Sequence, residues 1–143
     1  MTAGLVTYRG VVYPWQCDQV GHLNVMWYVG KFDEATWNLF ADMGMTASYF
    51  RERNRGMAAV QQNITYKREL FAGETILVRS RVLEVRDKVI RFVHEMTLTD
   101  GGEVAALCDL TGVHLDRGAR KSVPLEADVA ERAQALAVDA GAA

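Results

Sequence analysis

The sequence predicts an α+β fold in which one long amphipathic helix packs against a mostly antiparallel β-sheet. Two patterns point to this fold. A strand and then a helix of about nineteen residues come first, and four further strands joined mostly by short polar turns follow. The chain has 143 residues, of which 50% are hydrophobic and 24% charged. This is enough for a sizeable core, and we expect one domain over residues 1–143.

The N-terminal half alternates between strand and helix signals. β-Branched and aromatic residues mark the first strand, which has Pro14 near its end. Asn24 is suited to cap a helix, and Gly44 is suited to end it. Between them, apolar residues recur at helical spacing. We therefore expect a strand at 6–15, a loop at 16–24, a helix at 25–43 and a short helix at 46–53.

The C-terminal half alternates at strand spacing. Polar turns at 86–88 and 99–102 favour hairpins. Val60, Ile64 and Tyr66 are expected to face inward. Gly112 marks a bulge or a close approach of another backbone, whereas His94 and His114 are interpreted as residues of the sheet faces. We expect strands at 58–69, 76–85, 90–98 and 104–115, and a C-terminal helix at about 124–138. Residues 135–143 form a low-complexity tail that we expect to be frayed.

The composition argues against several classes of function. The formal net charge of −2 does not favour a nucleic-acid partner. No apolar run reaches the length of a membrane span, and residues 1–9 do not resemble a signal peptide, so we expect a cytoplasmic protein. Cys17 and Cys108 lack metal-site spacing and are expected to be free thiols. We expect no metal site.

Asp18 lies in a Gly-containing loop that leads directly into the long helix. A carboxylate beside helix-end amides can act as a base or nucleophile while those amides receive an oxyanion. Alternatively, Asp18 has only a structural role as the cap of its own turn. His22 either assists catalysis or forms a hydrogen bond that stabilises the loop. Trp27 and Tyr28 lie about 100° apart on the helix, so one of them is expected to line a pocket or an interface and the other the core.

The order Asp18-x-x-Gly21-His22-x-Asn24-x-x-x-Tyr28, followed by Phe32 and Ala35, resembles the signature of the hotdog-fold acyl-CoA thioesterases. The nearest group is the 4-hydroxybenzoyl-CoA thioesterase-like family, and the resemblance covers about residues 6–118. It implies a five-stranded antiparallel sheet wrapped around one long central helix, plus a C-terminal helix. It also implies homodimers or homotetramers joined edge to edge, with active sites at the dimer interface.

The resemblance further implies that Asp18 is the catalytic carboxylate, acting as nucleophile or as general base on water. Coenzyme A is then part of the substrate, and no cofactor is implied. Many relatives carry a second Asp where this chain has Gln16, and a second Asn where it has Val25. The residues implied in substrate or oxyanion binding are Gly21, His22, Asn24, Val25, Met26, Trp27 and Tyr28.

Other interpretations of the sequence remain open. Basic residues at 79–91 or 117–121 are candidates for holding the phosphates of coenzyme A, and the acyl carrier could instead be a protein. A hotdog dehydratase or hydratase would pair His22 with Glu34 or Asp33. A non-catalytic acyl-CoA-binding protein on the same fold is a third possibility.

Overall fold

The computed structural model describes residues 4–142 and confirms the α+β class. Its helices and strands follow the expected order, with the addition of a short 3-10 turn and a two-residue strand. The elements are β1 (Leu5–Val11), η1 (Pro14–Gln16), α1 (Val25–Asp42), α2 (Ala47–Arg53), β2 (Arg55–Tyr66), β3 (Thr75–Val85), β4 (Val89–Leu98), β5 (Val104–Asp116), β6 (Lys121–Ser122) and α3 (Ala127–Ala142).

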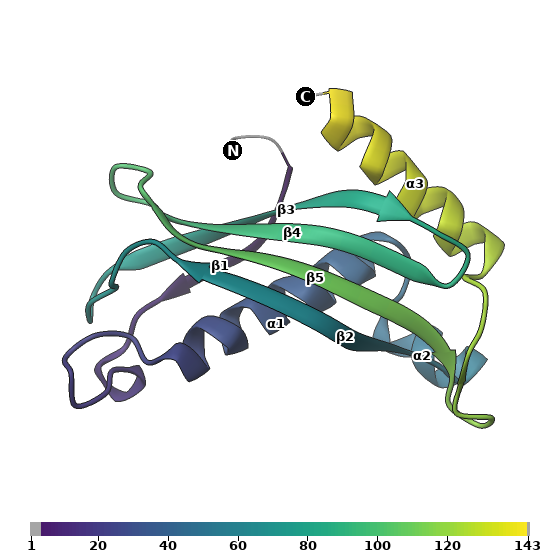
Figure 1. Ribbon diagram of the computed structural model, residues 1–143, viewed down its shortest axis with the longest axis horizontal. Helices are drawn as coiled ribbons and strands as arrows, with labels where there is room; N and C mark the ends of the chain where they lie inside the picture. The colour runs from purple at the N-terminus through teal and green to yellow at the C-terminus, as the bar shows by residue number, and fades with distance from the viewer. Residues whose placement is uncertain (1–3, 143) are drawn as a thin grey trace.

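The five long strands form one antiparallel sheet in the order β1-β3-β4-β5-β2, and β6 adds to β5. The sheet curves over α1, which lies along one of its faces (Figure 1). Strand β4 is central, and β2 forms a long edge whose middle residues, 59–63, are all exposed. An exposed edge of this length offers unpaired backbone groups to another strand.

Helix α1 is set by its two ends and one buried face. The Asn24 side chain accepts a hydrogen bond from the Met26 amide at 3.0 Å, which confirms the expected N-cap. Just past its C-terminus, Gly44 adopts φ = +90°, a conformation that glycine reaches without steric cost. Phe32 and Leu39 are fully buried in the core that α1 shares with the sheet.

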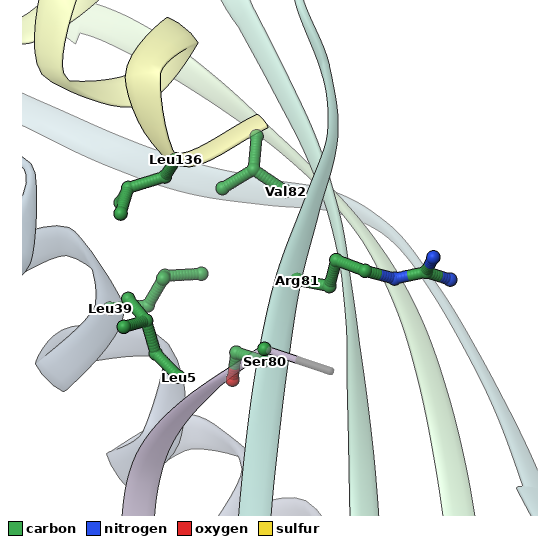
Figure 2. A pocket seen from close by; sticks show the side chains of 7 residues that line it. Leu5, Leu39, Ser80, Arg81, Val82 and Leu136 are labelled. Carbon is green, nitrogen blue, oxygen red and sulfur yellow. The ribbon is translucent and has the colours of Figure 1, made fainter. Parts of the chain in front are cut away.

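Helix α3 closes the far end of α1 and lies against β3 (Figure 1). Leu39 of α1, Val82 of β3 and Leu136 of α3 line a pocket of about 170 Å³ there, with Leu5 of β1 at its side. Figure 2 shows these apolar side chains around the cavity, whereas Arg81 points away from it. The expected helical end of the chain is confirmed and extends through residue 142, beyond the expected 138.

The first strand is shorter than expected. It ends at Val11 rather than at Trp15, because Pro14 has no amide hydrogen to donate and instead begins the turn η1. The turn exposes Trp15, which remains 65% accessible beside the loop that follows. This early end moves the chain out of the sheet just before the Asp18 loop.

The expectation that Val60 faces inward is wrong. Ala59 pairs with Gly112 and Gln61 pairs with Thr111, so Val60 is the extra residue of a β-bulge in β2. It is 62% exposed. The bulge switches the side chains that follow it to the opposite face of the sheet. A regular two-residue alternation along β2 therefore assigns the wrong face at this point.

His94 and His114 lie on strands β4 and β5, and both are fully buried. His94 Nε2 lies 2.8 Å from Thr36 Oγ1, and its Nδ1 lies 2.5 Å from Ser80 Oγ. Thr36 donates to the Phe32 carbonyl at 2.9 Å, so it accepts from His94 Nε2–H, and Nδ1 accepts from Ser80. His94 is therefore a neutral link between α1, β4 and β3. No cluster of potential metal ligands occurs in residues 4–142.

We expect His94 to make the fold sensitive to acid. Burial lowers the pKa of His94 from 6.5 to about 3. Between these values the unfolded chain binds a proton that the folded chain excludes, so the free energy of unfolding falls as pH drops. The expected slope from this group is up to about 1.4 kcal/mol per pH unit. Urea unfolding between pH 7 and pH 4 measures it.

The matched variant for this measurement is His94→Gln, which removes the titrating ring. Its slope should be shallower than that of the wild type over the same pH range. Equal slopes, together with an imidazole NMR titration near pH 6.5 in the folded protein, would contradict the assignment.

Candidate active site

The loop from Gln16 to Asn24 is closed by its own backbone. The Asn24 amide donates to the Gln16 carbonyl at 3.0 Å, and the Asp18 amide donates to the His22 carbonyl at 3.1 Å. The Gly21 amide donates a hydrogen bond to the Asp18 carbonyl at 3.0 Å, and Gly21 has φ = +94°. A side chain is rarely tolerated at this angle, which explains the glycine. The loop thus holds Asp18 just before the start of α1.

The Asp18 carboxylate is fixed by two donors. Its Oδ1 accepts from the Val20 amide and its Oδ2 accepts from the Asn24 side-chain amide, both at 2.9 Å. The hydrogen bonds from Asn24 and Val20 lower the pKa of Asp18 from its ordinary value. Asp18 is therefore ionised at neutral pH. A carboxylate held in this state can serve as a base or as a nucleophile.

The amides at the start of α1 divide into occupied and free groups. Leu23 donates to Leu70, Met26 donates to the Asn24 side chain and Trp27 donates to the Asn24 carbonyl. The Val25 amide has no hydrogen-bond acceptor among the residues that the structure describes, and its side chain is exposed. A free amide at a helix N-terminus can receive an oxyanion. Among the first three helix positions, 25–27, Val25 is the one whose amide is free.

The other expected site residues lie on different sides of this loop. His22 Nε2 is 3.6 Å from Glu69 Oε1, and the described contacts of His22 include neither Asp33 nor Glu34. Tyr28 is buried and donates to the Arg68 carbonyl at 3.0 Å. Together, His22, Tyr28 and Glu69 help to line a hollow of about 250 Å³ beside the start of α1.

Trp27 points away from Tyr28, as the helical spacing predicts. Its ring meets Trp15 edge to face, with centroids 4.9 Å apart, and Trp15 stacks on Tyr13 at 6.1 Å. Tyr13 and Trp15 are both exposed. Accessible aromatic rings beside an ionised carboxylate are typical of a surface that a ligand or another chain covers.

The two groups of basic residues do not come together. Arg86 and Arg91 line a polar hollow with Gln61 on the outer face of the sheet. Arg117 and Arg120 line a separate hollow at the other end of β2. Neither hollow includes a residue of the Asp18 loop, so the two groups remain alternative candidates for a phosphate site.

The sequence reasoning missed a second pocket along α1, which we call the α1 pocket. It has a volume of about 140 Å³, and its lining includes Val29, Asp33 and Trp37 of α1 together with Phe92 of β4 and Gly112 of β5. The i, i+4, i+8 spacing of residues 29, 33 and 37 was the available signal, because it places them on one helix face.

A sequence model of the thioesterase-like superfamily matches residues 12–133. The chain belongs to this superfamily. The assignment confirms the resemblance carried by the Asp18 motif and places the protein among the thioester hydrolases. No helix in the described residues is long and apolar enough to cross a membrane.

Two curated relatives agree with this assignment. A betainyl-CoA thioesterase of Pseudomonas aeruginosa is 27% identical over 137 residues, covering 96% of this chain and 86% of the relative. An L-carnitine dehydrogenase/betainyl-CoA thioesterase of Agrobacterium fabrum is 29% identical over 108 residues. That match covers 76% of this chain and 22% of the longer protein.

The fold also matches solved structures. A Staphylococcus aureus protein solved in complex with CoA superposes with a TM-score of 0.89 at 14% identity, over 97% of this chain and 88% of that protein. The curved antiparallel sheet and its helices are therefore those of the hotdog fold, as the family resemblance implied.

Proposed function

We propose that this thioester hydrolase acts on acyl-CoA and that Asp18 is its catalytic carboxylate. The observation that carries the proposal is the ionised Asp18 carboxylate, held by Val20 and Asn24 next to the free amide of Val25. A thioester carbonyl between these groups would meet a base or nucleophile on one side and an oxyanion donor on the other.

The chemistry then follows one of two routes. As a base, Asp18 takes a proton from water while the hydroxide attacks the carbonyl carbon. As a nucleophile, it forms a mixed anhydride that water then cleaves. In both routes the C–S bond breaks, coenzyme A leaves as the thiol after taking up a proton, and the acyl group is released as the free acid. The donor at Val25 stabilises the negative charge that develops on the carbonyl oxygen.

We further propose that the working site forms between two copies of the chain paired along β2. Strand β2 is an edge strand, and its residues 59–63 are exposed. The exposed rings of Tyr13 and Trp15 give a second surface that is suited to being covered. Sedimentation equilibrium should give the mass of two chains or of four, and a monomer at micromolar concentration would overturn this part of the proposal.

The direct test is thiol release from a panel of short, medium, long, aromatic and cationic acyl-CoAs. Betainyl-CoA belongs in the panel because two relatives are named for it. Turnover of at least one member supports the proposal. If the protein releases no thiol but binds acyl-CoA, the non-catalytic alternative on the same fold replaces it.

A further inference from the structure

The α1 pocket combines a buried apolar floor with a single charge at its mouth. Phe92 and Gly112 form part of the floor and are buried, whereas Asp33, Trp37 and Val29 at the mouth are exposed. Gly112 keeps the floor open, because a Cβ atom at this position would approach the Met57 methyl group to 3.1 Å. The pocket can therefore admit a compact group from the α1 side.

Aromatic rings form one wall of this pocket. The rings of Trp37 and Phe40 meet edge to face with centroids 5.7 Å apart, and those of Phe40 and Phe92 do so at 5.5 Å. Rings held at right angles turn a face in more than one direction. Faces of this kind attract cations, and aromatic cages are used to recognise quaternary ammonium groups.

The charge of the lining has one sign. Asp33 is the only ionisable residue in the described lining, which contains no Lys, Arg or His. Its carboxylate makes no ion pair or hydrogen bond with the described residues, and it follows Val29 by one helical turn on the same face. An unpaired carboxylate beside aromatic rings would favour a cationic group over a neutral group of the same shape.

We propose that the α1 pocket binds the end of an acyl group that carries a quaternary ammonium, with Asp33 and Trp37 as the specificity-determining residues. This inference rests on the proposed acyl-CoA hydrolysis and adds the substrate class. The rings of Trp37, Phe40 and Phe92 surround the methylated cation, and Asp33 balances its charge without a hydrogen bond, which a quaternary nitrogen cannot donate.

The direction of β2 explains how a pocket in the middle of α1 meets the reacting carbonyl. Tyr66 at the end of β2 packs on Tyr28 near the start of α1, at 5.0 Å, whereas Met57 near the beginning of β2 lines the α1 pocket with Phe40. Strand β2 thus runs opposite to α1. Antiparallel pairing of two β2 edges turns the Asp18 loop of each copy toward the α1 pocket of the other.

The test compares betainyl-CoA with 3,3-dimethylbutyryl-CoA, in which carbon replaces the charged nitrogen and the shape is kept. We expect the wild type to prefer the cationic thioester by about tenfold or more in kcat/KM. Asp33→Asn and Trp37→Leu should each remove most of this preference, mainly through KM. The matched control is Glu34→Gln, which removes a negative charge from the neighbouring position of α1.

The outcomes separate the two proposals. Equal wild-type rates on both thioesters, or an equal loss on both in Asp33→Asn, would overturn the inference and leave acyl-CoA hydrolysis intact. If no thioester is cleaved, hydrolysis fails, and the inference is decided by binding of choline against 3,3-dimethylbutanol, followed by Trp fluorescence. Stronger binding of choline that is lost in Asp33→Asn supports the pocket, and equal binding overturns it.

Discussion

Asp18→Asn should lower kcat for acyl-CoA hydrolysis by about 10²–10⁴-fold, the range expected for removing a catalytic base. The amide keeps the size of the side chain and one of its acceptors, so the hydrogen bond from Val20 or from Asn24 can persist. The neutral group can neither take a proton from water nor attack a thioester. Steady-state thiol release on the best substrate of the panel gives the ratio.

The control for this variant is Asp100→Asn, which neutralises an exposed carboxylate in the β4–β5 hairpin. It should keep wild-type kcat. Thermal unfolding of both variants checks that the loop is intact. An Asp18→Asn protein with wild-type turnover would remove Asp18 from the mechanism and make Glu69 and His22, whose side chains lie 3.6 Å apart on the other side of the loop, the next candidates.

Val25→Pro should lower kcat by about 10²–10³-fold, because it removes the one helix-start amide proposed to receive the oxyanion. Proline is tolerated at the first position of a helix. The preceding residue, Asn24, already has φ = −70° and ψ = 146°, a conformation that a following proline favours. The Val25 side chain is exposed, so the ring has space. We therefore expect Val25→Pro to leave the backbone conformation of the loop and the helix start unchanged.

The comparison for this variant is Val25→Ala, which shortens the side chain but keeps the N–H group. Its kcat should remain within a few-fold of that of the wild type. If Val25→Pro and Val25→Ala were equally active, the oxyanion donor would lie elsewhere, and the His22 amide, which also has no described acceptor, would be the next candidate.

The Asp18 loop and α1 could be predicted from sequence because their determinants are local. The cap at Asn24, the glycine at Gly21 and the carboxylate at Asp18 act on residues within a few positions of themselves. The helical spacing then fixed which side chains face the sheet. Determinants of this kind can be recognised within one short stretch of sequence, and the structure confirms the positions of the loop and the helix.

The bulge at Val60 and the burial of His94 could not be predicted in this way. The bulge depends on how β2 aligns with β5, about fifty residues away. His94 is buried and neutral, and its two hydrogen-bond partners, Thr36 and Ser80, come from α1 and β3. Both features depend on contacts between segments that are distant in the sequence. Nothing in a single sequence indicates which residues form those contacts.

The α1 pocket falls between these two cases. The helix contributes Asp33 and Trp37 at a spacing that is visible in the sequence, but the floor comes from Phe92 and Gly112 on neighbouring strands. A carboxylate and an aromatic ring one turn apart are ordinary on a solvated helix face. The pocket forms only because strands β4 and β5 pack beneath this face of the helix.

Helix α1 carries two separate determinants, Val25 at its first position and Asp33 eight residues later. At 1.5 Å per residue they are about 12 Å apart along the axis of one copy. In the proposed pairing they also serve different sites, because each site takes Val25 from one copy and Asp33 from the other. Effects at the two positions should therefore multiply in a double variant. Acyl preference could then be re-engineered at positions 33 and 37 without loss of the chemical step, using one helix as a common scaffold.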